Sequence, residues 1–397
     1  MSLASHSFDA IVVGAGPAGS STAAVLATSG ARVALVDKAR FPRDKLCGGL
    51  LSARSLGTMR KVFGPQCAFP IEFTSTAATV FDRERRLVRV GSCKPLHFTS
   101  RRTFDASLVQ LATAAGATLL EGTAVKALDV TAGTVELDDG SALSAPFVVG
   151  ADGAASRVRK MLGVQMDREG FAVGLEAEVP RDTMARDITE PEIYFGLVEW
   201  GYGWIFPKCA TVTVGIGGLA ARNGDMRTRF REFATAALGR VPDERLCGSP
   251  IPFGNFVATP GRGSTLLVGD AAGLVEPLTG EGIAFAIQSG RHAAHAVLEA
   301  ARRNAPSHAL RLYRPGYRSI VQSFRDVRLL RNLVFSRGTR GVFLRALHGN
   351  ERMVLKHMEV LAGDADYRDY ARFALGETLR HLPRLCRAAL RQVRGAQ

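Results

Sequence analysis

The feature that most constrains this chain is a glycine-rich segment near its start, GAGPAG at residues 14–19. An apolar, β-branched run at 8–13 precedes it and predicts a buried parallel strand. An alanine-rich run at 20–29 predicts a helix, and a second apolar run at 32–37 predicts the next strand. A glycine-rich turn between strand and helix is typical of the βαβ unit that binds dinucleotides, whereas without that context it would indicate only a structural turn.

The residue types in this segment suit the binding of a pyrophosphate. Gly14 permits the tight turn, Gly16 lets the backbone approach the anion, and Gly19 allows the helix to pack closely on the strand. The N-terminus of the helix offers free N–H groups to the phosphates. An acid at the end of the second strand is expected to accept ribose hydroxyls. The candidate nucleotide contacts in this part of the chain are Gly14, Gly16, Ala18, Gly19, Asp37 and Lys38.

Three later segments extend the pattern: RRTFD at 101–105, DGAASRVR at 152–159 and VGDAAG at 268–273. Together with the first glycine-rich segment, they resemble the signatures of the para-hydroxybenzoate-hydroxylase-type flavoproteins. The resemblance implies a single FAD site built from segments about 250 residues apart. In it, the carboxylate of the last segment accepts a ribityl or ribose hydroxyl, and the following helix points its N-terminus at the cofactor. The FAD contacts implied are Arg101, Asp152, Gly269 and Asp270.

Within that superfamily, three segments resemble the geranylgeranyl reductase family: DKLCGG at 44–49, YGWIFPK at 202–208 and PLTGEGI at 277–283. The whole resemblance extends to about residue 305. It implies that the Cys-Gly-Gly loop lies over the flavin ring and that the aromatic strand lines a cavity for a prenyl chain. The flavin-facing residues implied are Cys47, Gly48, Gly280, Gly282 and Ile283, and the substrate-lining residues are Tyr202, Trp204 and Phe206.

Some of these features have simpler explanations. The alternating aromatic residues of 202–206 could fill a core beneath a sheet, and an isolated cysteine such as Cys47 is more often a small buried hydrophobe than a reactive thiol. His292 and His295 have ligand-like spacing, but no third ligand lies near them in sequence, so we expect packing or surface roles and no metal site.

The resemblance leaves the reaction open. In the reductase interpretation, reduced FAD passes a hydride to a prenyl C=C bond, and Cys47 is the first candidate proton donor, with Tyr202 or a held water as alternatives. In the monooxygenase interpretation, reduced flavin and oxygen hydroxylate or epoxidise the ring of a prenylated quinone, quinoline or other aromatic compound. Flavin halogenases are more distant, and a non-catalytic flavin-binding redox sensor would not need a pocket beside the ring.

The sequence contains a single GxGxxG unit, so the reductant has no resident nucleotide site of its own. We therefore expect NADPH or NADH to bind transiently, with reduced ferredoxin as an alternative. Arg159 and Lys45 are candidate contacts for that nucleotide, or else surface charges.

The order of the elements predicts an α/β (α+β) fold with a Rossmann-type FAD-binding domain, an inserted mixed β-sheet substrate domain and a helical C-terminal region. The FAD-binding domain is discontinuous. We assign residues 1–65, 96–165 and 258–305 to this FAD-binding domain, residues 66–95 and 166–257 to the substrate domain, and residues 306–397 to the basic helical region.

Composition narrows location and partners. The 397-residue chain has no run of 18 apolar residues and no signal-peptide pattern, and its six cysteines form no CxxC pair, so we expect a cytoplasmic protein without disulfides. Residues 306–397 hold 18 Lys and Arg against 7 Asp and Glu, and thus +11 of the net +14.

The last of these residues form a basic periodic stripe. This stripe predicts either a solvated helix face or a peripheral contact with an anionic membrane, and without an accompanying motif we expect no nucleic acid partner. Its members are Arg380, Arg384, Arg387, Arg391 and Arg394.

Overall fold

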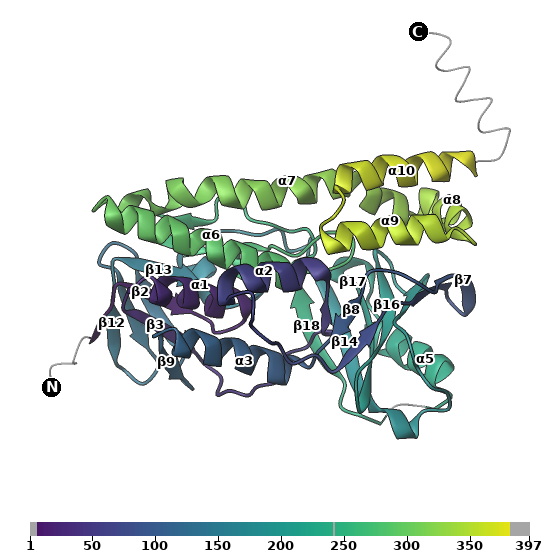
Figure 1. Cartoon of the computed structure of the whole chain (residues 1–397), viewed down its shortest axis with the longest axis horizontal. Helices are drawn as coiled ribbons and strands as arrows, with labels where there is room; N and C mark the ends of the chain where they lie inside the picture. The colour runs from purple at the N-terminus through teal and green to yellow at the C-terminus, as the bar shows by residue number, and fades with distance from the viewer. Residues whose placement is uncertain (1–5, 241–242, 382–397) are drawn as a thin grey trace, which may run out of the picture.

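The computed structural model describes residues 6–240 and 243–381. Its nucleotide-binding sheet has six strands, five of which run parallel, and helices α1 and α3 lie beside it (Figure 1). Four of the parallel strands are fully buried, and the fifth, at the edge, is partly exposed. The predicted α/β class with a Rossmann-type sheet is confirmed. In spatial order the strands are β19 (Gly261–Arg262), β20 (Thr265–Leu267), β13 (Phe147–Gly150), β2 (Ala10–Val13), β3 (Val33–Asp37) and β9 (Thr118–Glu121), of which β19 alone is antiparallel.

Three helices belong to this layer: α1 (Pro17–Thr28), α3 (Arg101–Ala114) and α6 (Ile283–Arg302). Helix α1 begins three residues earlier than the run at 20–29 predicts, because Pro17 supplies the fixed φ that suits the first turn. Helix α3 begins at Arg101, where the Ser100 side chain accepts from the Arg102 N–H at 3.2 Å. Since parallel strands end at one edge, the segments that follow β2, β3, β13 and β20 meet there.

A seven-stranded mixed sheet forms the second layer. Helix α5 (Met226–Leu238) covers one of its faces, where Phe230 and Phe233 pack on Leu175 and Ile216. The other face is turned toward the C-terminal helices (Figure 1). Its strands, in spatial order, are β18 (Cys247–Ile251), β14 (Ala172–Pro180), β17 (Thr211–Leu219), β16 (Gly201–Pro207), β15 (Glu192–Phe195), β6 (Ala78–Asp82) and β7 (Arg85–Val90).

Smaller elements complete the body. One small sheet contains β1 (His6–Ser7), β12 (Ala142–Ser144), β11 (Thr134–Leu137) and β10 (Val125–Asp129), and another contains β4 (Leu50–Leu51), β8 (Leu96–Phe98) and β5 (Phe73–Ser75). The short helices are α2 (Ala53–Phe63), α4 (Arg157–Met161), η1 (Arg181–Thr183), η2 (Ala220–Arg222), η3 (Gly269–Ala272) and η4 (Pro306–His308).

The described part of the C-terminal region is helical, as predicted. It contains α7 (Ala309–Phe335), α8 (Arg337–Leu347), α9 (Glu351–Ala362) and α10 (Tyr367–Arg380), and the last three cluster beside the seven-stranded sheet (Figure 1). Of the predicted basic stripe, only Arg380 belongs to the described residues, and Arg384, Arg387, Arg391 and Arg394 lie outside them. None of the described helices is long and apolar enough to cross a bilayer.

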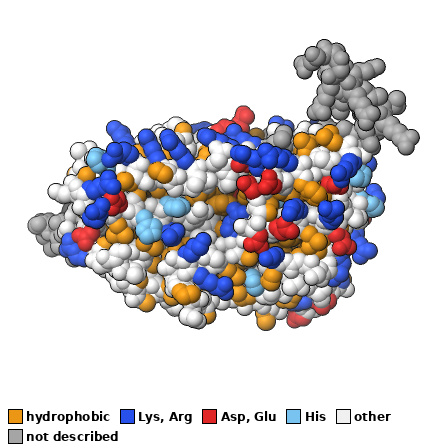
Figure 2. Space-filling model, turned by 45° about the horizontal axis from the view of Figure 1, so that its top comes forward, with side chains coloured by type: hydrophobic (Ala, Val, Ile, Leu, Met, Phe, Trp, Pro, Cys, Tyr) orange, Lys and Arg blue, Asp and Glu red, His pale blue; other side chains and the backbone are white. Residues whose placement is uncertain are grey.

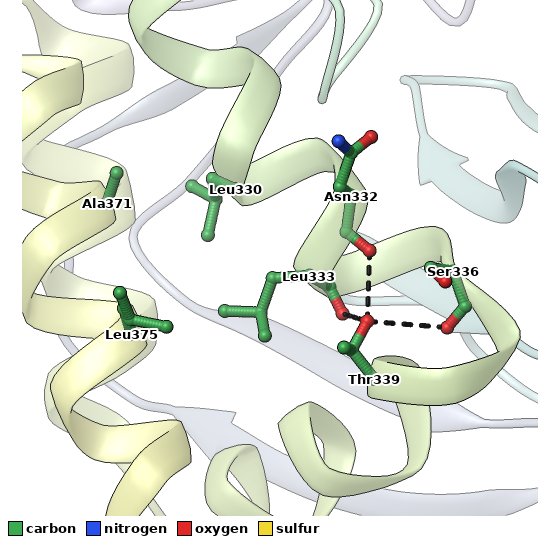
Figure 3. Close-up of a pocket in the computed structure, with 7 residues that line it drawn as sticks. All are labelled: Leu330, Asn332, Leu333, Ser336, Thr339, Ala371 and Leu375. Carbon is green, nitrogen blue, oxygen red and sulfur yellow. Dashed lines mark hydrogen bonds between the residues drawn. The ribbon is translucent and has the colours of Figure 1, made fainter. Parts of the chain in front are cut away.

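The junction between α7 and α8 is held by one hydroxyl. Thr339 Oγ1 is placed to donate to the carbonyls of Asn332 and Leu333 at the end of α7, at 3.0 and 2.9 Å (Figure 3). Beside it, Leu330, Leu333 and Leu375 border a small apolar hollow of about 240 Å³ between α7, α8 and α10. None of the side chains that line this hollow is titratable, so it offers no chemistry.

Helices α1 and α6 pack at close range because Gly290 has no side chain. A Cβ at Gly290 would lie 2.4 Å from the Ala18 carbonyl oxygen and 2.9 Å from Thr22 Oγ1. Gly290→Ala should therefore force the helices apart and lower the free energy of unfolding by about 1–3 kcal/mol.

Gly376 provides the matched control, because a Cβ there meets nothing within 4 Å inside α10. Gly376→Ala should raise stability by about 0.5–1 kcal/mol. Chemical denaturation of both variants checks the pair, and equal effects would contradict the packing argument.

Candidate active site

One large cavity of about 1030 Å³ connects the edge of the nucleotide-binding sheet with the inner face of the seven-stranded sheet. Its first part is bordered by the segments that follow β2, β3, β13 and β20. Its middle lies between the loop at 47–49, the loop at 278–283 and strand β16. Its far end lies beneath α8 and α9. The cavity therefore touches every segment that the motifs single out.

The first glycine loop has the geometry that its sequence predicts. Gly14 has φ +100°, and a Cβ there would lie 2.4 Å from the Ala151 carbonyl oxygen. At Gly19, a Cβ would lie 1.7 Å from the Gly14 carbonyl oxygen. A Cβ at Gly16 would instead meet only Arg43 Nη2, at 3.6 Å, so the backbone is open to the cavity there. Gly14 and Gly19 thus serve the fold, while Gly16 keeps space for a ligand.

Helix α1 presents an uncapped N-terminus to that space. Gly16 occupies the N-cap position without a side-chain hydrogen bond, and the first turn contains no acid. The free N–H groups and the positive end of the helix dipole therefore remain available to an anion.

Asp37 ties the loop to strand β3. Its Oδ2 accepts from the Ala15 N–H at 2.7 Å and its Oδ1 from the Ala39 N–H at 2.9 Å. A carboxylate oxygen can accept a second bond, so this arrangement still leaves room for a ribose hydroxyl. Lys38 is exposed beside it and borders the same part of the cavity.

Arg43 is a site residue that the sequence reasoning missed. Its Nη2 pairs with Asp105 Oδ2 at 2.9 Å, and its buried Nη1 has no hydrogen-bond partner among the described residues. It borders the cavity beside Gly16. Arg43 belongs to none of the motifs. Its only signal in the sequence is that it directly precedes DKLCGG.

Asp105 is shared with a second guanidinium. Arg101 donates to both of its oxygens, at 2.6 and 2.7 Å, and the side chain of Asp105 is fully buried. Arg101 also lies close enough to Cys47 for the two side chains to interact electrostatically. The predicted FAD contact Arg101 thus connects the nucleotide end of the cavity with the Cys-Gly-Gly loop.

The third motif lies beside the first, since a Cβ at Gly269 would lie 3.0 Å from Ala18 Cβ. Gly269 has φ +54°, and its N–H donates to Ser289 Oγ at 2.9 Å, while Asp270 borders the cavity. A Cβ at Gly282 would lie 3.5 Å from Asp270 Oδ1. Gly282 caps α6 without a side-chain bond, so a second helix N-terminus faces the cavity at Ile283.

Asp152 caps helix α4 from within its own motif. Its oxygens accept from Ser156 Oγ at 2.5 Å and from the Arg157 N–H at 2.6 Å. Both interpretations of Arg159 are wrong. Its guanidinium is buried and donates to the carbonyls of Ala271 and Ala154 at 3.1 and 2.9 Å, so it is neither a surface charge nor free to hold a nucleotide.

The Cys-Gly-Gly loop is clamped on three sides. The Cys47 N–H donates to Glu176 Oε1 at 2.6 Å, and Gly49, at φ +76°, accepts from the Thr99 N–H at 3.0 Å. A Cβ at Gly48 would lie 2.7 Å from the Phe206 ring and 3.3 Å from Trp204 Nε1. The loop therefore lies directly on the aromatic strand, so two segments singled out by sequence are in contact.

The aromatic strand is both a cavity wall and part of a core. Tyr202, Trp204 and Phe206 all border the cavity, while Trp204 and Phe206 also pack with Leu96 and Phe98. The Tyr202 hydroxyl donates to the Thr279 carbonyl, and burial raises its pKa. This bond ties strand β16 to the loop that contains Gly280, whose φ is +72°.

Glu176 is the second residue that sequence reasoning missed. Its Oε1 accepts from Cys47, and its buried Oε2 has no hydrogen-bond partner in the part of the chain that the structure describes. A signal was present: in VGLEAEV, Leu175, Ala177 and Val179 alternate with Glu176 and Glu178, so the acids face away from the α5 core.

The far end of the cavity is apolar and is closed by helices. Its wall under the C-terminal helices contains the ring of His357, whose pKa burial lowers to about 4, and beside it the ring of Tyr370. The contribution of the C-terminal region to the substrate site was not predicted, because helical periodicity does not indicate which helix face will cover a sheet that is distant in sequence. The other lining residues there are Phe343, Leu347, Met353, Val354, Met358 and Leu361.

Known proteins share this arrangement. A model described as FAD binding domain matches residues 7–193. The chain is 32% identical to a menaquinone reductase of Mycolicibacterium smegmatis over 72% of this chain and 75% of that protein. It is 31% identical to a geranylgeranyl diphosphate reductase of Rhodobacter capsulatus over 78% and 80%, respectively. The chain belongs to the geranylgeranyl reductase family of FAD-dependent oxidoreductases.

A solved structure gives the same fold. A geranylgeranyl bacteriochlorophyll reductase-like protein from Thermoplasma acidophilum aligns with a TM-score of 0.76 at 22% identity, covering 94% of this chain and 96% of that one. The likeness therefore includes the C-terminal helices as well as the FAD-binding domain.

The residues of this family member fit FAD. The open backbone at Gly16, the uncapped N-terminus of α1 and the orphaned Nη1 of Arg43 form a cradle for a pyrophosphate. Asp37 lies where it would hold the adenosine ribose, and Asp270 with the N-terminus of α6 lies where it would hold the ribityl and flavin end.

Two glycine variants should separate binding from folding. Gly16→Val places a side chain in the open cradle, so we expect normal folding but FAD binding weakened by about 100-fold or more, because at least two charge-assisted hydrogen bonds are lost. Gly19→Val should instead prevent folding, since its Cβ collides with backbone. Thermal melting of flavin-free protein and FAD titration measure the two effects. Tight FAD binding by Gly16→Val would contradict the assignment.

Proposed function

We propose that this family member reduces a C=C bond in the prenyl chain of a lipophilic substrate. The observation that carries the proposal is the apolar far end of the cavity, which continues from the aromatic strand to the helices α8 and α9. A polar aromatic substrate alone would not need this additional apolar space. A chain of isoprene units would fill it and bring one double bond beside the loop at 47–49.

The relatives support the same substrate class. One is named for menaquinone and another for geranylgeranyl diphosphate, and both compounds carry prenyl chains. We favour a prenylated quinone over a diphosphate, because Lys208, which follows the aromatic strand, is already paired with Glu178 at 2.5 Å.

The residues of the cavity wall would orient the alkene and exclude water from it. An unactivated alkene reacts only when it is held in line with the hydride donor, and a narrow wall made of Trp204, Ile193 and Met358 would restrict its orientation. FAD, once reduced, supplies the hydride. The remaining proton has to come from a group in the cavity wall, for which Cys47 and Tyr202 are the candidates named by sequence.

NADPH or NADH would reduce the FAD in a transient encounter, with ferredoxin as the alternative reductant. The support is the single GxGxxG unit of the sequence. Lys45, which borders the cavity and donates to Ser249 Oγ at 3.3 Å, remains a candidate contact for the nicotinamide nucleotide.

Anaerobic single turnover tests the reaction. We expect photoreduced enzyme mixed with menaquinone under argon to reoxidise its flavin, measured by stopped-flow absorbance. After air has returned any quinol ring to the quinone, mass spectrometry should still find a product two mass units heavier per chain bond reduced. Geranylgeranyl diphosphate serves as the second substrate. A product sixteen mass units heavier that forms only with oxygen would establish the monooxygenase alternative instead.

We also propose that the protein docks peripherally on an anionic membrane, at its cytoplasmic face, since a prenylated quinone resides in lipid. Support comes from helix α7, where five exposed arginines recur on one face over about 26 Å. Lys and Arg side chains are prominent along the upper edge of the molecule in Figure 2, where α7 runs. The five arginines are Arg311, Arg314, Arg318, Arg325 and Arg328.

Changing these five arginines to Gln should weaken sedimentation with vesicles of anionic phospholipid, and added salt should weaken it in the wild type. A control of equal charge change removes five exposed arginines from other elements. Unchanged sedimentation of the α7 variant would indicate a solvated face. The control positions are Arg32, Arg40, Arg83, Arg85 and Arg86.

A further inference from the structure

Glu176 occupies the middle of the cavity floor. Its side chain is 6% exposed, its Oε1 is fixed by the Cys47 N–H at 2.6 Å, and its Oε2 has no partner among the described residues. A buried carboxyl oxygen without a hydrogen bond is costly in a folded protein unless it carries a proton or meets a ligand. Because Glu176 borders the cavity, a bound substrate can provide that contact.

The sheet register places this carboxyl beside the aromatic wall. Glu176 on β14 pairs with Gly215 on β17, and Gly215 pairs with Trp204 on β16, so all three lie in one row on the same face. A Cβ at Gly215 would lie 2.3 Å from the Trp204 ring, so the indole lies over the glycine between itself and Glu176. No side chain of the row separates the carboxyl from the aromatic surface.

The two donors named from the sequence, Tyr202 and Cys47, are less available. The Tyr202 hydroxyl already donates its proton to the Thr279 carbonyl. The sulfur of Cys47 lies close to the Arg101 side chain and accepts from the Gly49 N–H at 3.5 Å.

Glu176 and Glu281 both border the cavity with an Oε2 that has no partner among the described residues. Glu281 is held through Oε1 by Ser52 and Ser55, and of the two acids it is Glu176 that shares a sheet row with Trp204.

The surroundings keep this carboxyl protonated near neutral pH. Burial raises its pKa to about 7, and Glu178 on the same strand adds to the shift, against the Cys47 N–H and the cations Lys208 and Lys45. Lys208 is itself paired with Glu178, which limits its effect. A carboxyl with a pKa near the working pH is suited to general acid catalysis.

We propose that Glu176 is the acid that completes the reduction, a role that rests on the proposed function. The alkene receives a hydride from reduced FAD on one carbon and a proton from Glu176 Oε2 on the other. The C=C π bond and the O–H bond break, and two C–H bonds form. The two electrons come from the nicotinamide reductant through FAD, and the Glu176 carboxylate regains its proton from water between turnovers.

Glu176→Gln tests this role, because the amide keeps an acceptor for the Cys47 N–H but holds no acidic proton. We expect unchanged FAD content and unchanged reduction by NADPH or dithionite, but single-turnover saturation of the menaquinone side chain slowed by about 100-fold or more. Glu176→Asp should recover part of that rate, since it restores the acid at a longer reach. Cys47→Ala removes the competing donor named from the sequence, so it should retain turnover with the pH dependence of the wild type, whatever its rate.

The pH dependence separates an acid from a structural residue. Because the donor must be protonated, the single-turnover rate of the wild type should fall as the pH rises through about 7. Glu176→Gln should lack this falling limb of the pH profile. ¹³C NMR of the oxidised holoprotein labelled at glutamate carboxyls gives a readout independent of turnover. Burial also raises the pKa of Glu276, to about 7, and that of Glu281, so the signal of Glu176 is assigned as the one that Glu176→Gln removes.

Each outcome decides between the two proposals. Wild-type protein that never saturates a prenyl chain would refute the proposed function. Wild-type turnover with an unimpaired Glu176→Gln would refute the acid role and leave the function standing, as would loss of the reaction in Cys47→Ala with FAD retained. If Glu176→Gln loses FAD, the Glu176→Asp rate decides: a normal pH limb and partial activity support the acid, and their absence overturns it.

Discussion

The buried carboxylate of Asp105 is the interaction on which the site depends. It holds Arg101 through two hydrogen bonds and Arg43 through a third contact, and its own side chain is fully buried. Removing a partner of a buried ion pair typically costs about 3–5 kcal/mol. Arg43 borders the pyrophosphate cradle, and Arg101 lies beside Cys47. The same carboxylate therefore connects the cofactor cradle with the Cys-Gly-Gly loop.

Most of the cofactor site could be predicted from the sequence, because its chemistry depends on local backbone geometry. A strand, a glycine turn and a helix N-terminus are contiguous in the chain, so the roles of Gly14, Gly16 and Gly19 can be predicted from the local sequence. Glu176 could not be placed this way, since its significance comes from register: only the pairing of β14, β17 and β16 brings it beside Trp204. Arg159 misled for a related reason, because a charged residue in a motif gives no sign that its partners are carbonyls from distant loops.

Glycines in the seven-stranded sheet show how a flat wall becomes a cavity. Gly215 and Gly217 on β17 lie under the Trp204 ring, and Gly174 on β14 pairs with Gly217. Glycine in a strand lowers β propensity and packs poorly, which is a cost to the sheet. Because these glycines have no side chains, the Trp204 indole can lie against the backbone. The space above the sheet therefore remains open between the aromatic strand and Glu176.

The far wall of the cavity comes from α8 and α9, more than 300 residues along the chain from the glycine loop that cradles FAD. The residues that would bind the cofactor and the residues that line the far end of the cavity therefore lie in separate parts of the sequence. Substitutions at Met353, Val354 or Met358 can lengthen or shorten the tunnel without touching a residue that holds FAD. Selection can thus retune chain-length preference within this fold while the redox chemistry stays unchanged.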